Sequence, residues 1–185
     1  MRTTLGFLLV LLFSLTSFSC SLLEGTRLSS DSPKTTIYVV RHAEKELGSA
    51  PGLTPQGSAR AEFYAKFFAK EKLSAVYSTP TRRTIATATP VAKAQKISVE
   101  EYANGLDFDA LAVTLLAEHE GETIFIVGHS NTVPLILNAL SKTEDHTDVP
   151  HEEYRRLYQV ILDAEHNADV RMWEVPVEVE VEVKD

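Results

Sequence analysis

The stretch TIYVVRHAEK, residues Thr36–Lys45, is the part of this sequence from which the fold can be worked out. Its first half is an unbroken run of β-branched and aromatic residues, which is typical of a strand in a parallel sheet covered on both faces. The run ends in Arg41 and His42. Ligands of open α/β sheets bind beyond the carboxyl ends of the strands. We therefore expect a cation and an imidazole there, suited to an anionic substrate and a nitrogen nucleophile. The alternative is a strand end capped by two solvated polar side chains.

The N-terminal segment has the composition of an export signal. One arginine precedes an apolar stretch shorter than the roughly 20 residues of a membrane-spanning helix, and Cys20, the only cysteine, follows it. The segment resembles a bacterial lipoprotein signal, which implies lipidation of Cys20 and membrane anchoring in the cell envelope, in the periplasm or at the outer membrane. A signal that is simply cleaved is the alternative. We expect a signal peptide over residues 1–20, a tether over 21–34, one domain over 35–175 and a C-terminal strand or tail over 176–185.

The charge of the chain limits its partners. Eighteen lysines and arginines stand against 26 aspartates and glutamates, a formal net charge of −8 at pH 7. This acidity argues against nucleic acid as a partner. It is compatible with a phosphorylated substrate if cations gather locally.

Strand-like and helix-like segments alternate through most of the domain. Apolar strands are predicted at 75–78, 97–100 and 123–128, helices at about 54–70, 81–91, 108–117 and 133–140, and a hairpin at 157–162 and 170–175. This alternation predicts an α/β domain of three layers, α/β/α, with a largely parallel central sheet. Pro90 is expected to limit the second helix.

Two further predicted strands deliver polar side chains to the same edge of the sheet. The strand at 75–78 leads to Arg82 and Arg83, and the strand at 123–128 leads to His129. Because the ends of parallel strands meet at one edge, two imidazoles and two or three guanidinium groups would surround one pocket. Such a pocket suits a phosphoryl group, since one imidazole can attack phosphorus while the other groups hold its oxygens.

Four segments, in order along the chain, resemble the motifs of the histidine phosphatase superfamily. RHAE at 41–44 is similar to its Arg-His-Gly signature, LTPQG at 53–57 to its Leu-Thr-x-x-Gly, TPTRRTIATA at 79–88 to its Ser-Pro-Leu-x-Arg-Ala-x-x-Thr-Ala, and VGHS at 127–130 to its second-histidine strand. The resemblance implies the phosphoglycerate-mutase-like fold. In the alignment that also fits Thr87 and Ala88, Arg83 rather than Arg82 corresponds to the phosphate-binding arginine.

The resemblance also implies a mechanism. His42 would attack phosphorus and carry a phosphohistidine that water then hydrolyses. Arg41, Arg83 and His129 would neutralise the phosphoryl oxygens, and Ser130 would join them in substrate binding. The protein itself supplies the cations, so no metal or other cofactor is expected. The implied activity is that of a phosphatase for phosphomonoesters or phosphoramidates, acting on a small phosphorylated substrate or a phosphoprotein.

Departures from the superfamily pattern concern the leaving group. Residues 45–50 lack the asparagine that the metabolic mutases carry, so mutase activity is not expected. Ser130 stands where the acid-phosphatase and phytase branch has an aspartate proton donor. Among the carboxylates before the helix at 108–117, Asp107 is our first candidate for this donor, and the alternative is that it caps the helix. Without a placed acid, the substrate would need a good leaving group, as in phosphohistidine.

Two other functions stay open at this level. GHSNT at 128–132 resembles a nucleophile elbow, in which Ser130 would be the nucleophile of a serine esterase, although Thr132 replaces the final glycine. The second is a non-enzymatic lipoprotein of the same fold that binds a phosphorylated ligand. His146 and His151 lie in a polar stretch whose spacing matches no strong zinc signature.

Overall fold

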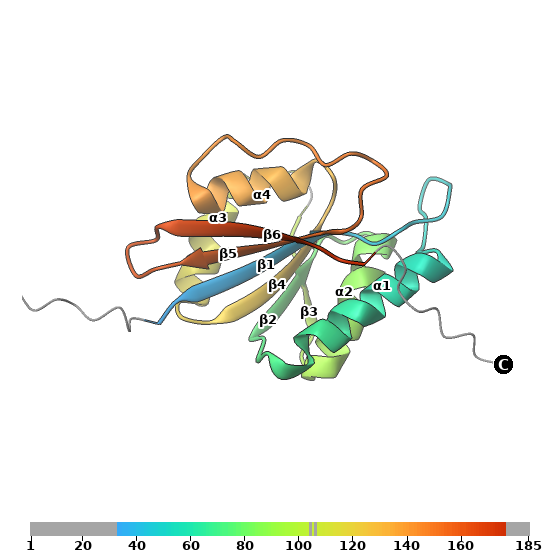
Figure 1. Cartoon of the computed structure of the whole chain (residues 1–185), viewed down its shortest axis with the longest axis horizontal. Coiled ribbons are helices and arrows are strands. Elements are labelled where there is room, and N and C mark those ends of the chain that lie inside the picture. Colours follow the sequence, from blue (N-terminus) through green and yellow to red (C-terminus); the bar gives the residue numbers. More distant parts are fainter. Residues whose placement is uncertain (1–32, 104, 106, 177–185) are drawn as a thin grey trace, which may run out of the picture. The chain divides into compact units, whose positions relative to one another are not determined.

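The computed structural model describes residues 33–103, 105 and 107–176. The predicted signal peptide with Cys20, most of the tether and nearly all of the C-terminal tail lie outside these residues. The described part contains one six-stranded sheet with two α-helices on each face (Figure 1). None of the described helices combines the length and the hydropathy that crossing a bilayer requires.

The sheet has the spatial order β3-β2-β4-β1-β5-β6. Strands β1 to β4 are mutually parallel, and β5 and β6 extend the sheet antiparallel on the β1 side. The strands are β1 (Thr35–Arg41), β2 (Ala75–Ser78), β3 (Val99–Glu101), β4 (Thr123–Gly128), β5 (Arg156–Leu162) and β6 (Ala168–Glu174). The helices are α1 (Pro55–Phe67) with a 3-10 turn, η1 (Phe68–Lys70), then α2 (Arg82–Gln95), α3 (Phe108–Glu118) and α4 (Thr132–Ser141). The predicted three-layer α/β/α domain with a largely parallel sheet is confirmed.

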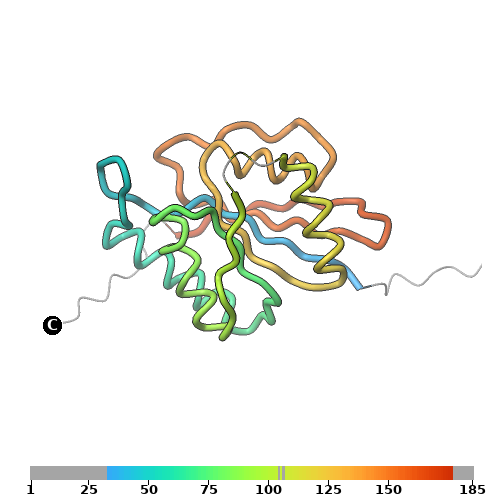
Figure 2. The backbone as a smooth tube through the Cα atoms, turned by 180° about the vertical axis from the view of Figure 1, so that it is seen from behind, coloured from blue at the N-terminus to red at the C-terminus, as the bar shows by residue number. Residues whose placement is uncertain are grey.

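Strand β1 shows why the sheet is covered on both faces. Its side chains alternate, so Ile37 and Val39 enter a core with α3 and α4, while Tyr38 and Val40 enter a second core with α1 and α2. The two helix pairs lie on opposite sides of the sheet in Figures 1 and 2. Each buried aliphatic side chain contributes roughly 1.5–3 kcal/mol relative to exposure. The apolar run therefore fixes β1 in the middle of the sheet.

The ends of two helices illustrate one prediction that holds and one that fails. Thr54 caps α1, since its hydroxyl accepts a hydrogen bond from the Gly57 amide at 3.0 Å and proline occupies the first helical turn. The expectation that Pro90 would limit the second helix was wrong, because α2 continues to Gln95. A proline removes one backbone hydrogen bond, and the burial of Val91 and Ala92 beyond it favours continuation.

The register of the parallel strands sets the position of the site. Arg41 at the end of β1 pairs with Gly128 at the end of β4, and Ser78 at the end of β2 pairs with Val127. The His42 amide then donates to the Gly128 carbonyl at 2.9 Å. The segments that follow β1, β2 and β4 therefore leave the sheet at one edge.

Candidate active site

His42 and His129 lie together at this edge, with ring centroids 5.5 Å apart and ring planes at 67°. Both are buried, at 3% and 9% exposed. They come from β1 and β4, which are adjacent and parallel, so the register described above brings them together. The sequence expectation that the two imidazoles converge is thereby met in the geometry.

The hydrogen bond of His42 defines its protonation. Nδ1 lies 2.8 Å from the carbonyl oxygen of Ala43. A carbonyl can only accept, so Nδ1 carries the proton and Nε2 has a free lone pair. Burial, followed by the charges of Arg41, Arg83 and His129, lowers the pKa of His42 to about 3, although the bond to Ala43 opposes the shift. The ring is thus neutral at physiological pH and presents a nucleophilic nitrogen.

His129 is held by partners on both ring nitrogens. Arg83 Nη2 lies 3.1 Å from Nδ1, and because a guanidinium can only donate, Nε2 carries the proton and donates to the Thr79 hydroxyl at 2.9 Å. That hydroxyl donates in turn to Thr84 at 2.9 Å. Burial and the charges of Arg83 and Arg41 lower the pKa of His129 to about 4. A bound anion such as phosphate would favour the protonated form of His129 and would therefore raise its pKa.

Backbone approach at the end of β4 requires a glycine. A Cβ on Gly128 would lie 2.8 Å from the Thr132 hydroxyl, which accepts the His129 amide at 2.8 Å. Both the small residue and the threonine of the GHSNT stretch therefore position His129. In the described part, neither imidazole at the site is bonded to Ser130, whose carbonyl accepts the Val149 amide. This arrangement gives no support to the serine esterase interpretation.

Arg41 is buried and has two differently used edges. Nη1 donates to the carbonyls of Pro150, His151 and Glu153 at 2.9, 2.7 and 3.1 Å. On the other edge, Nη2 makes a long 3.5 Å contact to the Tyr154 hydroxyl, and Nε has no hydrogen-bond partner in the described part. This edge matches a carboxylate or phosphoryl group in shape. Burial lowers the pKa of Arg41, and the charge of Glu152 opposes this shift only in part.

Arg83 enters the same site from the first turn of α2. Its Nη2 donates to His129, and its Nε is buried without a partner among the described residues. Thr87, one turn later, accepts the Ala43 amide at 3.0 Å and donates to the Arg83 carbonyl at 2.8 Å. The Thr-Ala register that aligned Arg83 therefore has a physical meaning: it fastens α2 to the residue after His42.

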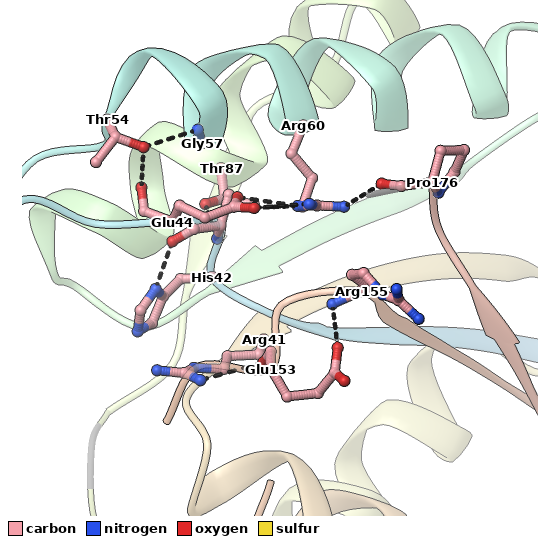
Figure 3. Close-up of polar contacts among 11 residues, drawn as sticks. Arg41, His42, Glu44, Thr54, Gly57, Arg60, Thr87, Glu153, Arg155 and Pro176 are labelled. Carbon is pink, nitrogen blue, oxygen red and sulfur yellow. Dashed lines mark hydrogen bonds and ion pairs between the residues drawn. The ribbon is translucent and has the colours of Figure 1, made fainter. Parts of the chain in front are cut away.

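Glu44 and the LTPQG segment hold the chain that follows His42 in place through hydrogen bonds. Glu44 accepts two bonds from Arg60 Nε at 3.0 and 2.9 Å and one from Nη2 at 2.6 Å, while Arg60 Nη1 donates to the Pro176 carbonyl (Figure 3). The Glu44 carbonyl accepts the Thr54 amide at 2.9 Å. A Cβ on Gly57 would lie 2.1 Å from that carbonyl, so only glycine permits this contact. Sequence reasoning identified the motif but missed the Glu44–Arg60 pair.

The loop before β5 forms one wall of the site, and the contribution of Tyr154 to that wall was not predicted. The Tyr154 ring lies 6.0 Å from the His42 ring and 4.2 Å from the Arg41 guanidinium carbon. Next to it, a cavity of about 730 Å³ is lined by side chains from this loop, from β1 and its following loop, and from α1. Its lining residues include Arg41, Lys45, Glu152 and Tyr154.

Other sequence candidates lie elsewhere or serve other roles. Asp107 caps α3, since its exposed carboxylate accepts the amides of Asp109 and Ala110 at 3.0 and 3.3 Å. This is the alternative that the sequence left open, and the proton-donor role of Asp107 stays a prediction. The described residues contain no cluster of three or more histidine, cysteine or acidic side chains arranged to hold a metal.

Residues 37–106 match the family model described as histidine phosphatase superfamily (branch 1). This match supports the resemblance to the histidine phosphatase superfamily that the sequence motifs indicate. It spans the first three of the four motifs quoted from the sequence. No curated protein matches the chain.

Solved structures with this fold include several phosphatases of low sequence identity. Protein histidine phosphatase SixA, complexed with tungstate, is 19% identical and covers 76% of this chain and 96% of its own, with a TM-score of 0.58. Bacillus stearothermophilus YhfR is 19% identical and covers 79% and 100%, with a TM-score of 0.62. Entamoeba histolytica phosphoserine phosphatase, in complex with 3-phosphoglyceric acid, is 16% identical and covers 77% and 98%, with a TM-score of 0.59. These likenesses confirm the phosphoglycerate-mutase-like fold.

Proposed function

We propose that this protein is a metal-independent phosphatase that hydrolyses a phosphomonoester or phosphoramidate through a phosphohistidine on His42. The observation that carries the proposal is the state of His42, a buried neutral ring whose Nδ1 proton is bonded to Ala43. It lies beside two guanidinium groups whose Nε atoms have no partner among the residues that the structure describes. A neutral imidazole next to fixed cations suits attack on an anionic phosphoryl group.

Each step of the proposed reaction uses a described group. Nε2 of His42 attacks phosphorus, and the bond to the leaving oxygen or nitrogen breaks. The free edges of Arg41 and Arg83 neutralise the phosphoryl oxygens, and His129, with Ser130, completes the binding of the group. Water then attacks the phosphohistidine and releases phosphate. Because preorganised cations are worth about 10²–10³ in rate each, these side chains supply the charge stabilisation that a metal supplies in other phosphatases.

The substrate is proposed as a small phosphorylated molecule or a phosphoprotein. SixA acts on protein phosphohistidine and the Entamoeba enzyme on phosphoserine, as their names state. Phosphohistidine has a better leaving group than an alkyl ester and needs less help from an acid. A panel of phosphorylated sugars, nucleotides, inositol phosphates and phosphohistidine peptides, assayed with and without a chelator, tests the proposal. Hydrolysis that survives chelation is expected, whereas activity abolished by the chelator contradicts it.

The rival of the same fold is a protein that binds a phosphorylated ligand without turning it over. It is weakened by the geometry of His42, because a binding site has no use for an imidazole held with a free, unprotonated Nε2. Wild-type protein that binds phosphate but hydrolyses no member of the panel would favour this rival.

We also propose that the protein is exported and anchored in a bacterial envelope membrane through a lipid on Cys20. The support is the sequence pattern of the N-terminal segment. Incorporation of a labelled fatty acid into the wild type and its loss in Cys20→Ser test the anchor. Label that persists in the variant contradicts it.

A further inference from the structure

The loop that precedes β5 is fixed to both histidine-bearing strand ends. The Val149 amide donates to the Ser130 carbonyl at 3.0 Å. Arg41 Nη1 donates to three carbonyls of the same loop, those of residues 150, 151 and 153, and the last of these bonds appears in Figure 3. A group carried by this loop is therefore held in place relative to His42 before any substrate arrives, as preorganised catalysis requires.

Tyr154 is a side chain of this loop that lies against both Arg41 and His42. Its ring lies under the Arg41 guanidinium at 4.2 Å and its hydroxyl lies 3.5 Å from Arg41 Nη2. In that contact the guanidinium donates, so the phenol proton is not used in it. The ring centroid lies 6.0 Å from that of His42. The hydroxyl thus lies beside the edge of Arg41 that is free to receive a phosphoryl group.

The neighbouring cavity is large enough to hold the leaving group of a substrate. It has a volume of about 730 Å³ and shares Arg41 and Tyr154 with the phosphoryl site. A phosphoryl group held by His42 and Arg41 would direct its remaining substituent past Tyr154 into this cavity. The oxygen that departs from phosphorus would then pass the phenol.

We propose that Tyr154 is the catalytic residue that protonates the leaving oxygen, an inference that rests on the proposed function. As the lone pair of His42 Nε2 forms the bond to phosphorus, the bond from phosphorus to the leaving oxygen breaks. The leaving oxygen keeps the electron pair of that bond and takes the phenol proton, giving an alcohol and a tyrosinate. The cation of Arg41 stabilises the tyrosinate. In the second step the tyrosinate takes a proton from the attacking water, the new oxygen–phosphorus bond forms, the nitrogen–phosphorus bond breaks, and the starting state returns.

The other acidic groups in range fit the donor role less well. Glu152 lines the same cavity and acts on Arg41 only through its charge, with no hydrogen bond to the guanidinium in the described part. Asp107 is engaged as the cap of α3. The Tyr154 hydroxyl has a proton to donate and lies against the Arg41 cation, which would stabilise the phenolate that forms when the proton leaves.

The test is a leaving-group series on the full chain. Values of kcat/KM are measured for aryl and alkyl phosphates of rising leaving-group pKa, for the wild type and for Tyr154→Phe, with Glu152→Gln and Asp107→Asn as matched variants. Loss of a general acid costs about 10²-fold or more on poor leaving groups. We expect Tyr154→Phe to lose this factor on alkyl phosphates and little on p-nitrophenyl phosphate, so that the dependence on leaving-group pKa becomes steeper.

Several results would overturn the donor role. One is that Tyr154→Phe slows all substrates equally, which indicates a positioning role only. Another is that kcat/KM depends more steeply on leaving-group pKa in Glu152→Gln or Asp107→Asn than in Tyr154→Phe. If Tyr154→Phe does not fold, 3-fluorotyrosine placed at position 154 keeps the shape and makes the phenol more acidic. The alkaline limb of kcat/KM for an alkyl phosphate should then move to lower pH, and an unmoved limb contradicts the proposal. Hydrolysis that persists in His42→Ala would instead overturn the proposed function itself.

Discussion

Arg60 and Arg41 are buried to nearly the same extent, at 1% and 4% exposed, yet their pKa values shift in opposite directions. Burial lowers both, but hydrogen bonding and attraction to Glu44 reverse the effect and raise the pKa of Arg60. Among the described residues no carboxylate is bonded to Arg41, and carbonyls and a tyrosine occupy part of its donor set. The charge of Arg60 is therefore neutralised within the fold, whereas the charge of Arg41 stays available for an anionic ligand.

The comparison extends to the edges of the two guanidinium groups. Arg60 uses Nε and Nη2 together to hold Glu44, which is the bidentate arrangement that stabilises an oxyanion best. On Arg41 and Arg83 the Nε atom is buried and has no partner in the described part. A buried donor without a partner costs about 1–3 kcal/mol. That cost is tolerated at a site that binds an anion, and Arg41 and Arg83 differ from Arg60 in this respect. The Nε of Arg155 is also buried without a partner in the described part, but the Nη2 of Arg155 pairs with Glu174.

The test with the largest expected effect removes the proposed nucleophile from the site that the two functional arginines surround. His42→Ala should lower kcat/KM for p-nitrophenyl phosphate roughly a thousandfold or more, because no other described group has a free imidazole nitrogen beside both site arginines. His119→Ala is the matched control, since His119 is bonded to Tyr77 and Glu122 away from the site. Comparable loss in both variants would contradict the assignment.

The second test removes the charge of one of the two arginines at the site. Arg83→Met should lower kcat/KM by about 10²–10³, the value of one donor to a charged transition state. Arg82→Met changes the preceding, exposed arginine and should cost no more than a few-fold. A larger loss from Arg82→Met than from Arg83→Met would show that the alignment through Thr87 selects the wrong residue.

The third test addresses the structural arginine. Arg60→Met leaves the Glu44 carboxylate without its partner and should lower the free energy of unfolding by about 3 kcal/mol in chemical denaturation. Adding Glu44→Leu should restore part of the loss, because the unpaired charge is then removed as well. Arg171→Met, which breaks an exposed pair with Asp169, should cost no more than about 0.5 kcal/mol. Equal losses at positions 60 and 171 would remove the distinction between the two kinds of arginine pair.

The smallest expected effect concerns pH. Folding lowers the pKa of His42 from an ordinary 6.5 to about 3, so the unfolded chain binds the proton more readily than the native state. Stability should therefore be unaffected by this group above pH 6.5 and fall as the pH is lowered through that value, by up to about 2 kcal/mol at pH 5. His42→Gln should weaken this dependence, as measured by denaturant unfolding at pH 7 and 5. An unchanged dependence would indicate that His42 titrates normally in the fold.

Local patterns made much of the fold predictable from the sequence. The apolar run of β1, the cap formed by Thr54 and Pro55, and the strand ends that carry His42 and His129 all depend on neighbouring residues. The Pro90 prediction failed because tertiary burial of the turn beyond it outweighs one lost hydrogen bond.

The parts of the site that were missed depend on distant contacts. Glu44 and Arg60 are 16 residues apart on different elements. Tyr154 lies at the site in a loop whose carbonyls are bound by Arg41, more than 100 residues earlier. No periodicity or motif marks Tyr154, so its position at the site became visible only in three dimensions.

The central claim is that His42 becomes covalently phosphorylated, and trapping the intermediate tests it most directly. The enzyme is mixed with a phosphorylated substrate, quenched during turnover in alkaline denaturant, which preserves phosphohistidine, and mapped by peptide mass spectrometry. The account predicts one phosphoryl group on the His42 peptide, absent from His42→Ala. Turnover with the phosphoryl group found on His129 or Ser130, or on no residue at all, would contradict it.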